Sequence, residues 1–172
     1  MKDDFIRPIL VLTLVSLVVS GALALLNGIT EPVIAKAAAE RAEAAMFEII
    51  PEADGFESVP LEGLPESILE VYISTNDVGF IFVVGAVGYG GEIRLLCGVG
   101  TDGRMIRCTT LEHAETKGLG SRITEQRFEN QFIGVDFKLV GVEAITGATV
   151  SSGAYIGAVS DALAAHSVCS GR

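Results

Sequence analysis

The sequence predicts an α+β protein, in which a single N-terminal transmembrane helix precedes a mostly antiparallel sheet packed with helices. An uncharged apolar run begins the chain, short β-type segments separated by tight turns fill its middle, and an apolar-striped helical segment ends it. We expect three parts: a transmembrane anchor at 1–30, a juxtamembrane helix and connector at 31–66, and a folded domain at 67–172.

The anchor is predicted from the 23 positions from Pro8 to Thr30, which hold no charged residue. At roughly 1.5 Å per helical residue, this run crosses a bilayer core of about 30 Å. A cleaved signal peptide is the alternative, because Ala22-Leu23-Ala24 resembles a small-residue cleavage site. The apolar run continues beyond that triplet, so an uncleaved anchor in the lipid bilayer is favoured.

The orientation of the anchor is weakly encoded. Lys2 and Arg7 precede the span, and Lys36 and Arg41 follow it closely, so the positive-inside rule gives little preference. A first span with so short a leader usually leaves its folded part outside the cytoplasm. We therefore expect a single-pass protein of the cell (inner) membrane with its domain on the extracytoplasmic side.

The charge balance excludes one class of partner. The net charge is −10, and nucleic-acid-binding proteins present basic surfaces instead, so we expect no nucleic acid partner. Residues 31–70 hold ten Asp or Glu and two Lys or Arg, which is typical of a solvated surface.

A second helix is predicted after the anchor. Thr30 can cap it, with Pro32 in its first turn, and the Ala- and Glu-rich stretch to residue 50 suits a helix that ends before Pro51. Residues 51–66 are rich in proline and glycine and predict a connector with little regular structure.

The sheet is predicted from β-branched and aromatic segments separated by short turns, which favour antiparallel pairing. The segments are 71–74, 79–84, 92–99 and 104–109, with a glycine turn at 88–91. Beyond them we expect a polar loop at 113–123, a short helix at 124–130, a returning strand at 137–142, and a last helix running to about residue 166.

The three cysteines form no Cys-x-x-Cys pair and show no zinc or iron–sulfur spacing. A two-residue turn at Asp102-Gly103 sets Cys97 opposite Cys108, within disulfide reach. A three-residue turn shifts the register and separates them. A disulfide between these two cysteines is therefore an open hypothesis.

The start of the last helix holds the most informative stretch of the sequence. Thr146-Gly147-Ala148-Thr149 is followed by Val150, Ser151 and Ser152, which places four hydroxyl groups within seven residues. Backbone N–H groups at a helix start are unpaired, and the helix dipole attracts anions there, so a phosphate site is one interpretation. A plain threonine cap is the other.

The helical stripe extends the same interpretation. Ile156, Val159 and Leu163 recur at spacings of three and four, and the stripe continues backwards to Ser152 and Thr149, which places both on the buried face. His166, at the far end of the helix, is expected to be exposed.

The polar loop holds a second candidate segment. Gly118, Leu119 and Gly120 allow a backbone to approach a flat ligand closely, although an ordinary surface loop explains the same glycines. The two histidines lie on different elements, so no metal site is expected. Ser151 and Ser152 lack the setting of a hydrolase nucleophile, and no catalytic residue is predicted.

Together these segments resemble a known family, the FMN-binding subunits of membrane-bound redox pumps. Residues 143–149, Glu-Ala-Ile-Thr-Gly-Ala-Thr, are similar to the flavinylation motif Asp-x-x-Ser/Thr-Gly-Ala-Thr. Gly-Tyr-Gly-Gly at 88–91 and Glu-Thr-Lys-Gly-Leu-Gly at 115–120 are similar to two further family segments. The resemblance is strongest to the G subunits of Rnf complexes, and a sister group is the C subunits of sodium-pumping NADH:quinone reductases.

The resemblance implies an FMN-binding domain with FMN attached by a phosphoester to Thr149. A separate flavin transferase that uses FAD as donor makes this bond in the family. Thr146 is implied as a motif element that caps the helix. The implied cofactor-binding residues are Thr149, Thr146, Gly147, Ala148, Ser151, Ser152, Glu115, Thr116, Gly118, Leu119 and Gly120. Two positions depart from the family: Glu143 replaces the usual Asp, and Lys117 replaces the usual Pro, which would stiffen the loop.

By resemblance, the expected function is electron transfer within an ion-translocating ferredoxin:NAD oxidoreductase (Rnf) complex, in which this chain is a subunit without an independent catalytic centre. The implied partners are the A, D and E membrane subunits and the flavin transferase. Two alternatives stay open: the C subunit of a sodium-translocating NADH:quinone reductase, and a cofactor-free anchored structural protein.

Overall fold

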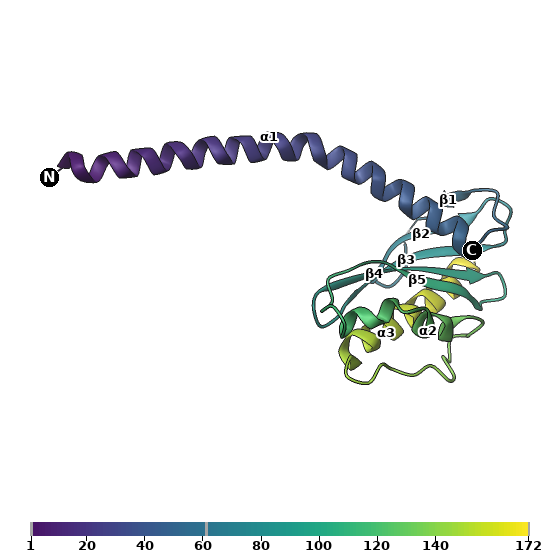
Figure 1. The fold of residues 1–172 in the computed structure, drawn as a ribbon. Coiled ribbons are helices and arrows are strands. Elements are labelled where there is room, and N and C mark those ends of the chain that lie inside the picture. The colour runs from purple at the N-terminus through teal and green to yellow at the C-terminus, as the bar shows by residue number, and fades with distance from the viewer. Residues whose placement is uncertain (1, 61, 172) are drawn as a thin grey trace. The chain divides into compact units, whose positions relative to one another are not determined.

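The computed structural model describes residues 2–60 and 62–171 (Figure 1). The chain divides into two compact units that meet between Ala42 and Glu43. The first unit is helical, and the second contains the whole sheet and the remaining helices.

One helix replaces the two that the sequence predicts before residue 50. α1 runs without a break over Lys2–Ile49, so the predicted start of a second helix at Thr30 is wrong. The Thr30 hydroxyl donates to the carbonyl of Leu26 at 2.9 Å, one turn back, instead of capping a new helix. The strong helix formers that follow Pro32 let the helix continue past it.

The apolar part of α1 has the length of a membrane span. Within the described residues, Ile9–Pro32 is the one helical segment long and apolar enough to cross a bilayer, with 24 residues and a mean hydropathy of 2.7. None of its most apolar stretch is buried inside the protein. Such exposure of leucine, isoleucine and valine suits a lipid environment.

The sheet has five strands in the order β1-β2-β3-β4-β5, and every neighbouring pair is antiparallel. The strands are β1 (Phe56–Ser58), β2 (Ile68–Ser74), β3 (Gly79–Val87), β4 (Glu92–Gly100) and β5 (Met105–His113). The last four confirm the predicted segments. The short β1 lies in the stretch that the sequence predicts as an irregular connector, and it pairs with β2 at one edge of the sheet. The α+β class with an N-terminal apolar helix is thus confirmed.

Short helices and one long helix complete the second unit. They are the 3₁₀ helix η1 (Gly120–Thr124), α2 (Gln126–Glu129), the 3₁₀ helix η2 (Asn130–Phe132) and α3 (Thr149–Cys169). The predicted strand at 137–142 is wrong, because this stretch consists of turns. Leu139 and Gly141 have φ values of 48° and 86°, which a strand cannot accommodate.

Each face of the sheet has its own apolar cluster. α3 packs on one face (Figure 1). Its Tyr155 and Val159 belong to the same buried apolar cluster as Phe82 and Leu95 of the sheet. On the other face, Met46, Ile49 and Ile50 contact Ile81, Val83 and Leu96. The end of α1 therefore belongs to the folded unit, although the same helix begins as the apolar span.

The two opposed cysteines confirm the predicted pairing, but the turn differs from the predicted one. Cys97 pairs with Cys108 across β4 and β5. The turn spans three residues, because the N–H of Gly100 donates to the carbonyl of Arg104 at 2.8 Å. A bulge between Gly98 and Val99 shifts the register by one residue and brings the cysteines back into opposition. Both are free, buried thiols.

His166 is buried, so its predicted exposure is wrong. Only 6% of its surface is accessible, because the apolar stripe of α3 continues through Ala162 and Ala165 to this position. Its ring packs edge-on against Phe80, with centroids 5.4 Å apart. Its Nε2 is buried and has no hydrogen-bond partner, and among the described residues no other buried side-chain nitrogen or oxygen lacks one.

The buried imidazole makes stability depend on pH. Burial lowers the pKa of His166 from its ordinary 6.5, and the negative charge of Asp102 offsets part of this effect. The folded state then binds fewer protons than the unfolded chain below pH 6.5, so stability falls as the pH drops through that region and levels off below the folded pKa. We expect the melting temperature of the wild type to fall relative to that of His166→Leu between pH 7 and pH 5. If the melting temperatures of the two proteins fell equally between pH 7 and pH 5, the assignment of this pH dependence to His166 would be contradicted.

Candidate FMN site

Three segments that are distant in the sequence meet at the start of α3. They are the glycine turn at 88–91, the loop at 115–120 and the first turn of the helix. The carboxylate of Glu115 joins them: it accepts from the N–H of Gly90 at 3.2 Å through each oxygen, and from the hydroxyl of Ser151 at 2.8 Å. Glu115 is 7% exposed, so the sequence places a charged group where it is almost fully buried and fully hydrogen-bonded.

The glycines around Glu115 leave the space that its side chain fills. A Cβ at Gly88 or at Gly120 would overlap a carboxylate oxygen of Glu115, and one at Gly90 would lie 2.9 Å from its Cα. The sequence suggests that Gly118 and Gly120 both serve a ligand. The structure separates them, because Gly120 packs on Glu115, whereas Gly118 faces open space with a φ of 79°.

The start of α3 has no side-chain cap. Ala148 is the N-cap residue, and no side-chain hydrogen bond caps the helix, so the predicted capping by Thr146 is wrong. The hydroxyl of Ser152 holds the turn instead: it accepts from the N–H of Ile145 at 3.0 Å and donates to the carbonyl of Ala148 at 2.9 Å. Gly147 has a φ of 84°, which bends the chain into the helix. The first turn therefore keeps backbone N–H groups available to an anion.

Thr149 is exposed, so its predicted place on the buried face is wrong. Ser151 and Ser152 are buried, with at most 1% of their surfaces accessible. Ala148 takes the inward position one turn before Ser152, which turns the side chain of Thr149 outward. The hydroxyl that matches the acceptor of the motif is thus open to a second protein.

The loop at 115–120 lies next to the motif. A Cβ at Gly147 would come within 3.8 Å of the side chain of Leu119, which is 48% exposed. Thr116 and Lys117 are exposed, and the carbonyl of Thr116 accepts from the N–H groups of Leu119 and Ser121. Glu143 is exposed, and the N–H of its backbone donates to Gln131 at 2.9 Å.

The arrangement fits a flavin nucleotide. An uncapped helix start suits its phosphate, and the exposed Thr149 hydroxyl lies at that start. Gly118 leaves open space next to Leu119, whose side chain is exposed and apolar. The cofactor-binding residues predicted from the sequence therefore fall into two groups, one exposed and one buried. Thr146, Gly147, Thr149, Thr116, Gly118 and Leu119 form the accessible surface, whereas Ala148, Ser151, Ser152, Glu115 and Gly120 are buried beneath it.

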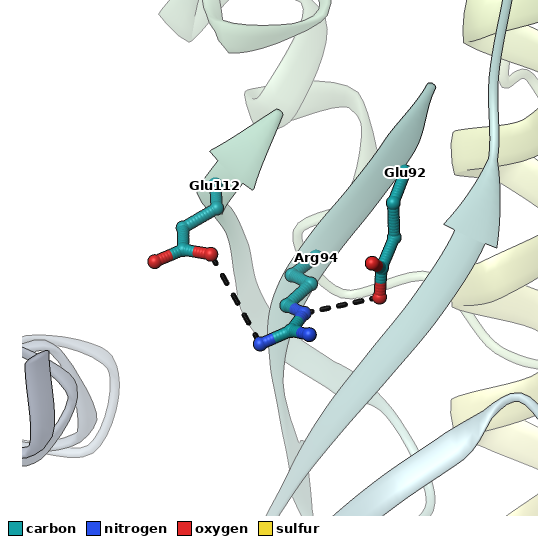
Figure 2. A network of polar contacts seen from close by, with 3 residues as sticks. All are labelled: Glu92, Arg94 and Glu112. Atoms are coloured by element: carbon teal, nitrogen blue, oxygen red, sulfur yellow. Dashed lines mark hydrogen bonds and ion pairs between the residues drawn. The ribbon is translucent and has the colours of Figure 1, made fainter. Parts of the chain in front are cut away.

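Exposed charged side chains form ion pairs on β4, the strand that follows the glycine turn, and on its neighbour β5. Figure 2 shows Arg94 of β4 between Glu92 and Glu112, with its guanidinium 3.0 Å from the first carboxylate and 4.0 Å from the second. These side chains are 47–68% exposed, and exposed ion pairs contribute roughly 0–1 kcal/mol to stability. This group differs in kind from the buried carboxylate of Glu115.

The fold and the site define a class of protein: a membrane-anchored FMN-binding domain protein. Residues 88–164, which contain all three segments of the site, match the family model of the FMN-binding domain. The chain is 33% identical over 171 aligned positions to the G subunit of the Na(+)-translocating ferredoxin:NAD(+) oxidoreductase complex of Acetobacterium woodii, covering 83% of this chain and 82% of the relative. It is 32% identical over 177 positions to the G subunit of the ion-translocating oxidoreductase complex of Methanosarcina acetivorans, covering 94% of each.

The chain therefore belongs to the family of G subunits of ion-translocating oxidoreductase complexes. The resemblance stated from the motifs is confirmed. A further relative, from Clostridium ljungdahlii, is 27% identical and is named for a proton-translocating complex, whereas the Acetobacterium woodii complex is named for sodium. Membership in the family thus does not specify the translocated ion.

Sequence reasoning misses the role of the glycine turn in the site. Gly88 and Gly90 are predicted only to make a tight turn, yet they also give the chain space to approach Glu115. The sequence carries one signal of this arrangement. The acidic residue Glu115 directly precedes the glycine-containing segment at 116–120, and Gly90, in the other glycine-rich segment, lies 25 residues before it.

Proposed function

We propose that this protein is an electron-transfer subunit that carries FMN, linked by a phosphoester to Thr149, in an ion-translocating ferredoxin:NAD oxidoreductase complex of the Rnf type. The observation that carries the proposal is the exposed Thr149 hydroxyl at the uncapped start of a 21-residue helix. The helix dipole and the free N–H groups favour a phosphate at this place.

The residues of the site would contact different parts of the flavin nucleotide. Thr149 would bear the phosphoester, Thr146 and Gly147 would line the path of the ribityl chain, and Leu119 would contact the ring system. Glu115, Ser151 and Ser152 would hold these groups in position from below. The flavin supplies the redox chemistry, and the protein supplies its position and surroundings.

The protein would work at the surface of a membrane. The apolar segment of α1 anchors it there, and its domain would lie on the extracytoplasmic side. In that place it would exchange electrons with neighbouring membrane subunits of types A, D and E, after a flavin transferase has modified it. Covalent attachment would prevent loss of the flavin in a compartment where free FMN is scarce.

The intact mass of the purified chain tests this function. We expect full-length protein that is co-expressed with a flavin transferase to gain the mass of one FMN less one water, located on the peptide that contains Thr149. A chain that gains no flavin under these conditions would instead support the cofactor-free structural alternative. Flavin that binds but is released on denaturation would retain the redox role and exclude the ester.

A further inference from the structure

Two buried thiols lie opposite each other in the centre of the sheet. Cys97 of β4 and Cys108 of β5 are cross-strand partners, and neither has accessible surface. A hydrogen bond joins the two thiols, and it is the main cause that raises the pKa of Cys97, with burial as the next. The hydroxyl of Tyr155 donates to the sulfur of Cys108 at 3.3 Å. Directly opposed cysteines on neighbouring strands satisfy the spacing that a disulfide requires.

A cavity of about 280 Å³ lies beside the strand that carries Cys108, and this residue is part of its lining, although the thiol itself has no accessible surface. Its lining includes Cys108 together with polar side chains of α2 and β5, among them Arg107, Thr109 and Glu129. Glu129 is held by the N–H of Thr110 at 2.9 Å, and burial raises the pKa of its carboxyl. A volume of this size admits a small polar molecule beside β5, and the sulfur of Cys108 must become exposed before it can react with that molecule.

We propose that Cys97 and Cys108 are a reversible dithiol–disulfide pair, which a low-molecular-mass disulfide oxidises by way of this cavity. The Cys108 thiolate attacks one sulfur of the reagent, which forms a mixed disulfide and releases one thiol. The Cys97 thiolate then attacks the sulfur of Cys108 and releases the second thiol. Two protein thiols are oxidised, one reagent disulfide is reduced, and the two protons end on the two released thiols.

The surroundings set the rate of this exchange. The thiolate is the attacking species, and the groups that face the pair are the neutral hydroxyl of Tyr155 on α3 and the carboxyl of Glu129 on α2. Neither of these two groups carries a positive charge that would favour the thiolate. Arg107, which also lines the cavity, is paired with Glu48 at 3.9 Å, and both sulfurs are fully buried. We therefore expect slow oxidation at neutral pH and faster oxidation as the pH rises, in contrast to the fast exchange of a catalytic cysteine.

Closing the pair would also strengthen the sheet. The bond ties β4 to β5 at residues that already lie opposite each other, so little rearrangement is needed, and it restricts the unfolded chain. Tyr155 would keep a sulfur atom as its neighbour. We expect the oxidised protein to melt at a higher temperature than the reduced protein, with the same secondary structure content.

Thiol counting by mass spectrometry tests the proposal. Full-length Cys169→Ser protein is treated with oxidised 2-mercaptoethanol, then denatured and alkylated without reduction. We expect no alkyl groups and a mass two hydrogens lower than that of the reduced chain, whereas untreated protein takes two alkyl groups. Two alkyl groups after prolonged treatment at pH 8.5, or a persisting mixed disulfide, would overturn the proposal.

A second variant tests the route of access. In Cys97→Ser, Cys169→Ser protein, Cys108 has no partner, so we expect it to retain the reagent as a stable mixed disulfide. An unmodified Cys108 in this folded variant would show that the cavity does not admit the reagent. Both variants keep a small polar side chain at the substituted position, and the untreated Cys169→Ser protein controls for folding.

Discussion

Thr149→Ala is expected to give a folded, full-length protein that carries no covalent flavin when it is co-expressed with the transferase. The proposed ester needs the threonine hydroxyl, and alanine removes only that hydroxyl and a methyl group from an exposed position. The cost in stability should stay within about 0.5 kcal/mol, as for other exposed substitutions. Flavin fluorescence on a denaturing gel and the intact mass measure the loss.

Two matched substitutions show whether the loss is specific to this hydroxyl. Thr149→Ser keeps a hydroxyl at the same place, and we expect it to retain part of the flavin. Thr146→Ala removes the other exposed threonine of the motif, which does not cap the helix, and should leave some attachment to Thr149. Flavin that survives denaturation in Thr149→Ala, or that disappears only in Thr146→Ala, would move the attachment site.

The sheet can be predicted from sequence because its signals are local. The four main strands follow from β-branched runs between glycine turns, and their antiparallel order follows from the short connections. The pairing of Cys97 with Cys108 shows the limit of such reasoning. The predicted partner is right, but it depends on a bulge that compensates a longer turn, and neither can be deduced from the residues alone.

The wrong predictions for Thr149, His166 and the helix boundary at Pro32 share a physical cause. The exposure of residues near a helix end, and the position of that end, depend on the surrounding residues. Extending the apolar stripe into the first turn of α3 predicts an inward Thr149, but Ala148 fills that position instead. Polarity and a place near a helix end predict an exposed His166, although the same stripe covers it. Pro32 predicts a helix boundary, yet strong helix formers on its C-terminal side sustain the helix.

The burial of Glu115 is beyond the reach of sequence reasoning for a different reason. Its partners Gly90 and Ser151 lie 25 and 36 residues away, on opposite sides of it in the chain. No local pattern pairs groups at such separations, and a carboxylate next to a polar loop predicts exposure or ligand contact. Only the assembled fold shows that this acidic residue joins the three segments of the site.

Glu115→Ala should therefore have the second large effect: a loss of about 2–4 kcal/mol in stability together with poor flavin loading. The substitution leaves the hydroxyl of Ser151, which is buried, without its partner, and an unsatisfied buried group costs roughly 1–3 kcal/mol. The N–H of Gly90, in an exposed turn, loses its partner at a smaller cost. It also opens a space between Gly88 and Gly120, whose missing side chains make room for Glu115. Urea denaturation and flavin stoichiometry measure the two effects.

A graded series separates the positioning of the site from general instability. Glu115→Gln keeps the size of the side chain and an oxygen that accepts from Gly90, so it should lose about 1–2 kcal/mol and load more flavin than the alanine variant. Arg94→Ala breaks the exposed charged group of Figure 2 and should change stability by at most about 1 kcal/mol. If Glu115→Ala matched Arg94→Ala in both measurements, the buried carboxylate would not hold the site together. If Glu115→Ala stayed folded at the loading temperature yet lost flavin, the carboxylate would act by setting the position of the helix start beneath Thr149.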